Sequence, residues 1–504
     1  MREFNILLAG SAAGLLSVVA AQAADLPSRK SAPVEYVRVC DAYGAGFYWI
    51  PGTDTCLKVG GRVRIDTWYT PAKNAVRLRS AGGPAYAGIA APVGTNIAPF
   101  QSANGIDQLG WYARGIVNMD ARTQSAWGTV QTVFSLRLAA QTGLAQTAPN
   151  GNLTAVPAAG TNGATIEAAY IRFAGFTIGQ AASNFTFLPP YQYHSNFSTG
   201  FPNGIRQLSY TATFGGGFSA TIALENRGDL GNSATANSLG ANPFTVAGAT
   251  ATAVGPQRLP ALVGNVRIDQ GWGSAMLSGA VLQNTVNFAS PAVQAVTNGL
   301  GPLVTKTGWA IAAGLRINLP MIAAGDHIQG WIGYANGAMD YVGYSGVNQN
   351  SAVTTNYLGG FLRNDRNVTI FCTTAAATCI PGSETTKSFN IAGMFTHYWT
   401  PSLRSNFIGS YIRITPGQVT QNTDWTNGGL SQVTAWDVKS NLIWSPVRNF
   451  DIGLELSYAR LSQRLTGLAG GLPTPLACTA ANPQCLASTS TNNWTGRMRV
   501  ERTF

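Results

Sequence analysis

The sequence predicts an all-β protein, a transmembrane antiparallel β-barrel of about 16 strands with short turns at one end and long loops at the other. Three observations predict this fold. The first residues have the pattern of an export signal, the composition is poor in charge and rich in glycine, and segments of about 10 residues alternate between apolar and polar side chains. Such alternation supplies a lipid-facing surface from every second residue.

The N-terminus has the pattern of a secretory signal. An apolar stretch covers residues 6–20, and Ala21-Gln22-Ala23 matches the small-x-small pattern of a cleavage site. A membrane anchor is the competing interpretation, but the apolar stretch is shorter than the roughly 20 residues that a spanning helix needs. The expected organisation is a signal peptide at 1–23, an N-terminal periplasmic segment at 24–56 and the barrel at 57–504.

The composition is unusual for a soluble enzyme. Charged residues make up 11% of the chain, against about 25% in an ordinary soluble domain. The chain has 58 glycines and 10% aromatic residues. The net charge of +11 could indicate a nucleic-acid partner, but the arginines are dispersed and the export signal argues against one. We interpret the excess as a field inside the barrel that acts on small solutes.

Period-two alternation identifies the strands. In one segment Phe450, Ile452 and Leu454 face one way, and the polar positions between them face the other. In a soluble sandwich the apolar face would be a core, whereas in a membrane barrel it would meet lipid, and alternation alone does not separate the two. The predicted strands are 57–69, 108–120, 128–139, 164–174, 175–182, 205–214, 217–227, 261–270, 273–285, 306–319, 325–336, 387–399, 402–415, 432–444, 449–461 and 492–504.

The connections favour the membrane barrel. Short connections contain turn residues, such as Ala174-Gly175 and Thr400-Pro401-Ser402, and they alternate strictly with long ones. This is the bacterial outer-membrane pattern, which predicts short periplasmic turns, long external loops and both termini in the periplasm. The long connections are 70–107, 140–163, 183–204, 228–260, 286–305, 337–386, 416–431 and 462–491.

The six cysteines fall into three pairs that are local in sequence. An even number of cysteines in an exported chain favours disulfides. A zinc site is the alternative, but the two short pairs have no nearby histidine and lack the usual ligand spacing. The expected disulfides are Cys40–Cys56, Cys372–Cys379 and Cys478–Cys485.

Residues 39–64 carry a long motif. They read VCDAYGAGFYWIPGTDTCLKVGGRVR, and an Ala-Asp-Leu-Pro run precedes them at 24–27. This stretch closely resembles the opening of the alphaproteobacterial outer-membrane general-diffusion porin family. The resemblance implies a barrel of about 16 strands in the cell outer membrane, among lipid bilayer and lipopolysaccharide. It also implies a homotrimer that passes small hydrophilic solutes and ions by passive diffusion without a cofactor, and a terminal aromatic residue, here Phe504, that serves in assembly.

The polar face of the predicted strands contains charged side chains, and we expect these side chains to line the pore. A transverse field between guanidinium and carboxylate groups would favour one sign of ion, and we expect a weak preference for anions. The alternative is a set of satisfied ion pairs without net selectivity. The expected basic residues are Arg62, Arg64, Arg114, Arg137, Arg172, Arg267, Arg316, Arg404, Lys439, Arg497 and Arg499. The expected acidic residues are Asp66, Asp120, Glu225, Asp269, Asp437, Asp451, Glu455 and Glu501.

The resemblance further implies that the third external loop, residues 183–204, folds into the pore and narrows it. This loop contains no Asp or Glu, which argues against strong cation selectivity. We expect its aromatic residues to pack the loop against the wall; a stacking surface for sugars, and hence a substrate-preferring channel, is the alternative. The expected constriction residues are Phe185, Phe187, Tyr191, Tyr193, His194, Phe197 and Phe201.

Catalysis is not expected. The only histidines are His194, His327 and His397, and the latter two have no adjacent acid–nucleophile motif. The sequence has no nucleotide-binding loop, metal-ligand cluster or short fixed repeat. The less favoured alternatives are a barrel hydrolase and a barrel adhesin.

Overall fold

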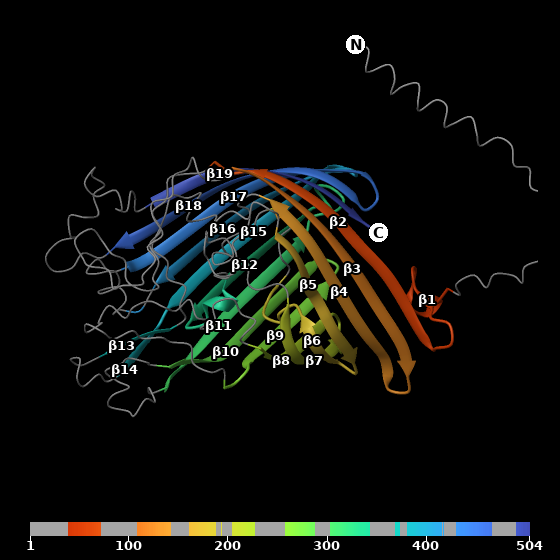
Figure 1. Cartoon of the computed structure of the whole chain (residues 1–504), viewed down its shortest axis with the longest axis horizontal. Helices are drawn as coiled ribbons and strands as arrows, with labels where there is room; N and C mark the ends of the chain where they lie inside the picture. Colours follow the sequence, from red (N-terminus) through yellow and green to blue (C-terminus); the bar gives the residue numbers. More distant parts are fainter. Residues whose placement is uncertain are drawn as a thin grey trace, which may run out of the picture.

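A computed structural model describes residues 39–71, 108–142, 161–187, 193, 204–226, 258–287, 303–342, 368–372, 381–415, 417, 430–465 and 490–504. Within these residues 16 strands form one closed antiparallel barrel, which confirms the predicted fold (Figure 1). The barrel closes where the last strand pairs with the first. The strands are β2 (Thr55–Tyr69), β3 (Leu109–Ser125), β4 (Gly128–Thr142), β5 (Thr161–Phe173), β6 (Phe176–Ala181), β7 (Ile205–Gly215), β8 (Phe218–Glu225), β9 (Ala261–Gln270), β10 (Gly273–Asn287), β11 (Leu303–Asn318), β12 (His327–Asn336), β15 (Lys387–Thr400), β16 (Leu403–Thr415), β17 (Leu430–Val447), β18 (Phe450–Leu465) and β19 (Ser490–Thr503).

Small elements that the sequence did not predict accompany the barrel. β1 (Tyr48–Trp49) pairs with β2, and β13 (Val368–Cys372) pairs with β14 (Pro381–Thr385) in a separate two-stranded sheet. Two short 3-10 helices, η1 (Asp41–Tyr43) and η4 (Met339–Tyr341), complete the described elements. In the part of the chain that the structure describes, no helix is long and apolar enough to cross a membrane.

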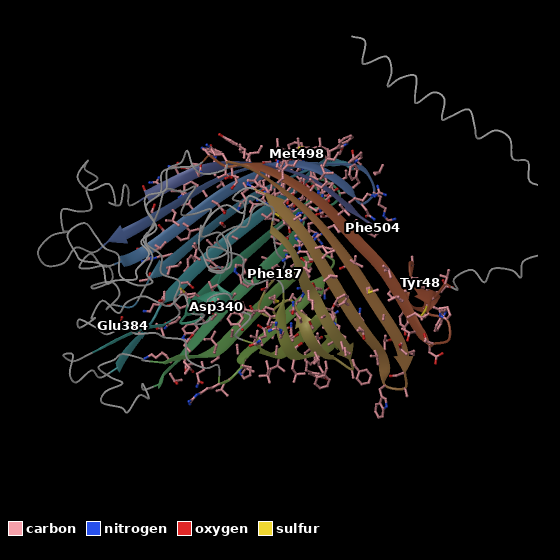
Figure 2. All side chains as sticks on the ribbon, viewed as in Figure 1. Tyr48, Phe187, Asp340, Glu384, Met498 and Phe504 are labelled. Atoms are coloured by element: carbon pink, nitrogen blue, oxygen red, sulfur yellow. A yellow bond between two sulfur atoms is a disulfide. The ribbon has the colours of Figure 1, made fainter. Side chains whose placement is uncertain are left out.

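The side-chain alternation has the orientation of a membrane barrel. On β18 Leu454 is 62% exposed while the next residue, Glu455, is fully buried, and on β2 Ile65 is exposed beside buried Asp66. Apolar side chains therefore cover the outside of the wall, where Met498 also points (Figure 2). A soluble sandwich would place these side chains in its core, so this alternative is excluded.

The short turns require particular residues. Gly175, between β5 and β6, has φ of +86°, and a Cβ there would lie 3.0 Å from the carbonyl oxygen of Thr211. Asn449, between β17 and β18, adopts φ of +63°, a conformation that Asn tolerates better than most residues. These turns hold neighbouring strands in antiparallel register and leave the long connections at the opposite end of the barrel.

The interior of the barrel contains an apolar core on one side. Phe185 of the third loop packs against Tyr341 of η4 and Trp331 of β12, with ring centroids 5.0 Å and 5.8 Å apart. Inward side chains of β7 to β12 complete this cluster, so the described start of the third loop lies inside the barrel. The segment that contains η4 also folds inward, which the sequence did not predict. The other members of the apolar core include Ile205, Ala223, Ala261, Val263, Ala280, Leu282, Ala310, Ala312, Ala335 and Val342.

The segment before β2 is tied to the barrel by a disulfide. Cys40 and Cys56 are bonded, as predicted, and pack with Phe47. The guanidinium of Arg122 on β3 stacks 4.8 Å from the Phe47 ring. In Figure 1 this segment, with β1, lies at the same end of the barrel as the β3–β4 turn. The other two predicted disulfides, Cys372–Cys379 and Cys478–Cys485, lie outside the described side chains.

Candidate functional site inside the barrel

The third loop contacts two separate parts of the inner wall. Phe187 lies 5.6 Å from the guanidinium of Arg267 on β9. Tyr193, six residues later, contacts β18 and β19: its amide donates to Glu455 at 2.8 Å, and Arg497 donates to its carbonyl oxygen at 2.6 Å. Phe187 and Tyr193 thus fix the third loop at two separate places on the inner wall, which lie at most about 22 Å apart along six residues.

Glycines on the wall make room for both aromatic rings. A Cβ at Gly314 on β11 would overlap the Phe187 ring, and a Cβ at Gly453 on β18 would overlap the Tyr193 hydroxyl. Both rings are almost completely buried. The Arg499 guanidinium also stacks 4.1 Å from the centroid of the Tyr193 ring. These described aromatics therefore pack the loop against the wall.

Charged side chains from both ends of the chain meet beside Tyr193. Asp66 on β2 accepts from Arg64 of its own strand at 2.9 Å and from Arg499 of β19 at 2.6 Å. Arg497 contributes a guanidinium that stacks 5.2 Å from the Trp68 ring. Arg62 pairs with Glu501 at 3.7 Å nearby. The closure of β19 onto β2 brings these residues together.

A further carboxylate at this site, Glu167 on β5, was not predicted from the sequence to face the interior. It forms ion pairs with Arg114 of β3 and, at 3.4 Å, with Arg137 of β4. Regular alternation would place Glu167 on the outer face with Ile171, but the register between β4 and β5 shifts at this point. The bulge turns the side chain inward. A bulge is visible only in the pairing of two strands, so the alternation within β5 alone could not predict that Glu167 faces inward.

The structure brings together six of the predicted basic residues and leaves the other five elsewhere on the inner wall. Arg172 stacks over Tyr170, and Arg267 pairs with Asp269 at 2.7 Å. Lys439 pairs with Asp437 on the same strand at 2.6 Å. In the ranges that the structure describes, Arg316 forms no ion pair. The six that gather are Arg62, Arg64, Arg114, Arg137, Arg497 and Arg499.

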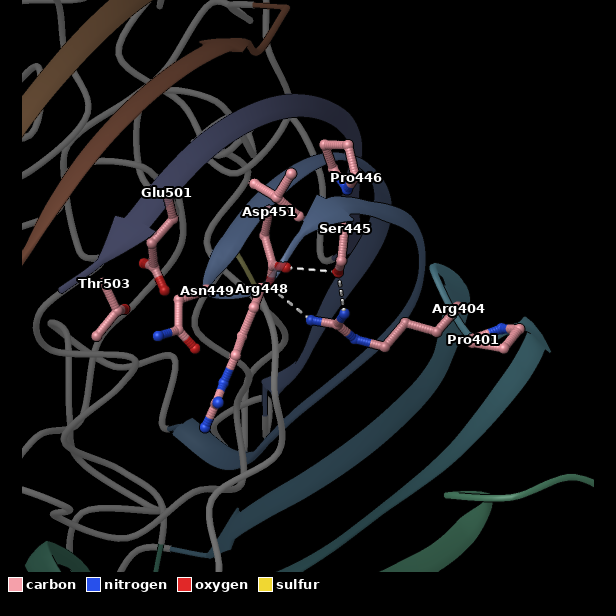
Figure 3. A pocket seen from close by; sticks show the side chains of 10 residues that line it. Pro401, Arg404, Ser445, Pro446, Arg448, Asn449, Asp451, Glu501 and Thr503 are labelled. Atoms are coloured by element: carbon pink, nitrogen blue, oxygen red, sulfur yellow. Dashed lines mark hydrogen bonds and ion pairs between the residues drawn. The ribbon is translucent and has the colours of Figure 1, made fainter. Parts of the chain in front are cut away.

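Arg404 lines a polar cavity of about 480 Å³ at the end of the short turns (Figure 3). It donates to Asp451 at 2.7 Å and to Ser445 at 2.8 Å, and Ser445 donates to Asp451 at 2.6 Å. Arg448 and Glu501 complete the charged lining. The cavity therefore carries both signs of charge near the periplasmic mouth of the barrel.

Glu225 anchors the start of the third loop. This buried carboxylate accepts from the Ser183 hydroxyl at 2.9 Å, from the Asn184 amide at 2.8 Å and from the Tyr341 hydroxyl at 3.1 Å. None of the described residues forms an ion pair with it. One carboxylate on β8 thus holds both the third loop and the η4 segment against the wall.

The histidines do not join this site. His397 donates from Nδ1 to Asp326 at 2.7 Å in the turn before β12. Burial raises the pKa of Asp326, but hydrogen bonds from His397 and from the Tyr398 amide outweigh it, so the pKa lies below its ordinary value. His327 approaches the Gly325 carbonyl oxygen at 3.0 Å. Among the described residues no group of three or more His, Cys, Asp or Glu is placed to hold a metal ion.

Four of the predicted constriction residues, Tyr191, His194, Phe197 and Phe201, lie outside the described residues. The described ones, Phe185, Phe187 and Tyr193, all lie inside the barrel, as the contacts above establish.

Comparisons with known proteins agree with this architecture. The sequence is 32% identical over 293 residues to Porin Omp2b of Brucella suis biovar 1 (strain 1330), a region that covers 56% of this chain and 66% of that protein. Porin Omp2b of Brucella abortus (strain 2308) matches to the same extent. The matched region thus spans just under two thirds of the length of these relatives.

A solved structure resembles the fold alone. The outer membrane channel DcaP of Acinetobacter baumannii aligns with a TM-score of 0.52 and 15% sequence identity, covering 90% of this chain and 99% of that one. The decisive match is to a family: residues 25–494 match the family described as Porin subfamily. The motif at 39–64, the closed barrel and this match lead to one conclusion: the chain belongs to the porin subfamily and is an outer-membrane β-barrel.

Proposed function

We propose that the chain forms a passive diffusion channel for small hydrophilic solutes and ions, with a weak preference for anions. The observation that carries the proposal is the charged cluster inside a closed barrel, where the described residues of the third loop contact the inner wall. A barrel with a polar inner wall offers a water-filled path through the bilayer. The membership of the porin subfamily supports a channel rather than an enzyme.

The charges at this cluster support the anion preference. Arg62, Arg64, Arg114, Arg137, Arg497 and Arg499 supply six positive charges, and Asp66, Glu167, Glu455 and Glu501 supply four negative ones. The excess of two positive charges sits in a confined space, where field lines are focused and anions are attracted. The pairing of most of these charges keeps the expected selectivity weak.

A plain diffusion channel is favoured over a sugar-stacking one. A stacking surface needs aromatic faces that are open to the solute. The three described loop aromatics, Phe185, Phe187 and Tyr193, are at most 4% exposed because wall residues cover them. Their role is therefore to fix the loop.

Planar-bilayer recording of the purified, folded protein tests the function. We expect stepwise increases in conductance, and in a KCl gradient a reversal potential displaced toward the chloride equilibrium value. Heat-denatured protein is the control. The absence of conductance steps would refute the channel, and a reversal potential on the potassium side would refute the anion preference.

We also propose a homotrimer that sits in the bilayer among lipopolysaccharide. The outer face of β2 to β5 supports subunit contact, because its described side chains include apolar Val63, Trp111, Leu138 and Ile171 and no charged residue. A broad apolar face without charge suits the centre of a subunit interface. Native mass measurement of the detergent-extracted protein should give three times the mass of the mature chain, and a monomer mass would contradict the proposal.

The signal peptide at 1–23 and the periplasmic segment at 24–56 complete the proposed organisation. The family match begins at residue 25, directly after the expected cleavage region, which supports the boundary. N-terminal sequencing of the mature protein should give Ala24 or Asp25 as the first residue. A chain that retains Met1 in the membrane would contradict it.

A further inference from the structure

Basic side chains gather on the outer face of β15, β16 and β18, near the ends that carry long loops. Lys387, Arg413 and Arg460 are exposed and share the outward parity of their strands, as Leu454 and Leu456 do on β18. In the described part of the chain none of the three forms an ion pair. Their charges are therefore available to a partner outside the barrel.

Charge on the outer face is confined to one sign and concentrated in one sector. Among the barrel-strand side chains that the structure describes, the other outward cations are Arg206 at the long-loop end of β7 and Arg502 at the short-turn end of β19. Every carboxylate of these strands faces inward, and β2 to β5 carry no outward charge. The inward carboxylates are Asp66, Asp120, Glu167, Glu225, Asp269, Asp437, Asp451, Glu455 and Glu501.

An aromatic row runs across the same sector at the same depth. Phe389, Tyr411, Trp436, Tyr458 and Trp494 come from β15 to β19, and successive ring centroids along the row lie 6.5 Å (Phe389–Tyr411), 5.3 Å (Trp436–Tyr458) and 4.8 Å (Tyr458–Trp494) apart. Outward aromatic girdles mark the level of the lipid headgroups in such barrels. The row therefore sets the depth of the nearby cations.

The strand register places the cations at and just beyond this row. Arg460 is paired with Trp436, so it lies at the level of the row. Arg413 lies two residues beyond Tyr411 toward the long loop and is paired with Phe389 of the neighbouring strand. With about 4.8 Å between strands, the Cα atoms of Arg413 and Arg460 lie roughly 12 Å apart. Two long side chains at this separation can converge on one headgroup.

We propose that Lys387, Arg413 and Arg460 form a lateral binding site for a phosphate-bearing glycolipid of the outer leaflet. The acyl chains would lie along the apolar wall below the aromatic row, and the phosphates would accept hydrogen bonds from the guanidinium groups. The site rests on the proposed membrane orientation, in which the long loops are external. It is independent of the pore, because these side chains point away from the interior.

Lipid retention by the purified full-length mature protein tests the site. The probes are a lipid A carrying two phosphates and the same lipid with both phosphates removed, and bound lipid is measured by native mass spectrometry. The double variant Arg413→Gln/Arg460→Gln should bind the phosphorylated lipid about 25-fold more weakly, at roughly five-fold for each basic residue near an anionic surface. The dephosphorylated lipid should bind equally to the double variant and the wild type.

Arg502→Gln is the matched control, because it removes an outward arginine at the opposite end of the barrel. It should leave lipid binding unchanged. Equal binding by the double variant and the wild type would overturn the proposal, as would an equal loss in Arg502→Gln. A change of oligomeric state in the double variant would instead assign the patch to a second copy of the chain and would also overturn it. Heat-dependent gel mobility checks that each variant is folded.

The conductance of the same samples separates this proposal from the proposed function. The double variant should conduct like the wild type. A wild type that binds the phosphorylated lipid without conducting would refute the channel and leave the lipid site standing.

Discussion

Replacing Glu225 with Leu should release the third loop from its anchor without unfolding the barrel. The carboxylate accepts hydrogen bonds from three residues, Ser183, Asn184 and Tyr341, and Leu can accept none of them. The barrel itself is held by backbone pairing between all neighbouring strands, which this substitution does not touch. Its effect should therefore be confined to the loop and the η4 segment.

The size of the effect follows from these three contacts. A hydrogen bond to a charged group contributes about 1.5 kcal/mol or more. The loss of three such bonds raises the free energy of the anchored loop by roughly 4 kcal/mol, which shifts the equilibrium toward the released loop by about three orders of magnitude. Tyr341→Phe removes only one bond, so its shift should be about ten-fold.

Single-channel recording measures the release as conductance noise. We expect the Glu225→Leu channel to fluctuate between sublevels, with a mean conductance above that of the wild type, because the loop no longer occupies a fixed part of the interior. Tyr341→Phe should give steadier traces that lie between the two. Wild-type traces from the folded Leu variant would refute the reasoning, because the contacts of Tyr193 would then suffice to hold the loop.

Three further substitutions probe other contacts. Gly453→Leu should displace Tyr193 from the wall, because even a Cβ overlaps its hydroxyl, and single-channel conductance should change while gel mobility does not. Glu167→Gln removes one negative charge from the cluster, so the reversal potential in a KCl gradient should move further toward the chloride value; an unchanged potential would contradict the assigned position. The pKa of Asp326 is lowered in the folded protein. The ionised carboxylate therefore contributes its full stabilisation above the ordinary Asp pKa of about 3.9. This stabilisation is lost as the pH falls through the lowered pKa of the folded state. Thermal unfolding of wild type and Asp326→Asn should therefore differ above about pH 4 and converge below it, and a constant difference at every pH would disprove the role of the pair with His397.

The strands and their two faces could be predicted because both are local properties. Whether Leu454 meets lipid and Glu455 meets the interior depends on a period of two within one strand and on the short turn that begins it. The alternation of long and short connections then predicts which strands are neighbours in the sheet, because short turns can join only adjacent antiparallel strands. Neither inference needs a contact between distant residues.

The inward fold of the η4 segment could not be predicted in this way. Ala338, Tyr341 and Val342 lie in a long connection without a regular period, and they are buried in a cluster that Phe185 of another loop and the inner wall complete. Glu225 also holds both segments, because it accepts hydrogen bonds from Ser183 of the third loop and from Tyr341 of the η4 segment. Each loop is thus placed by the other, and a single stretch of sequence does not contain that information.

Which charged residues of the cluster pair with one another depends on the closure of the barrel. Parity predicts that Asp66 and Arg499 point inward, but they are 433 residues apart and meet only because β19 pairs with β2 in a register that sets Arg499 opposite Asp66. A slip of one residue in that register would turn every side chain of β19 to the other face. Arg497 and Arg499 would then point into lipid, which opposes the slip because charge is costly at that surface. The buried pairs of the cluster therefore help to select the register that closes the barrel, and the same closure brings the charged cluster together inside it.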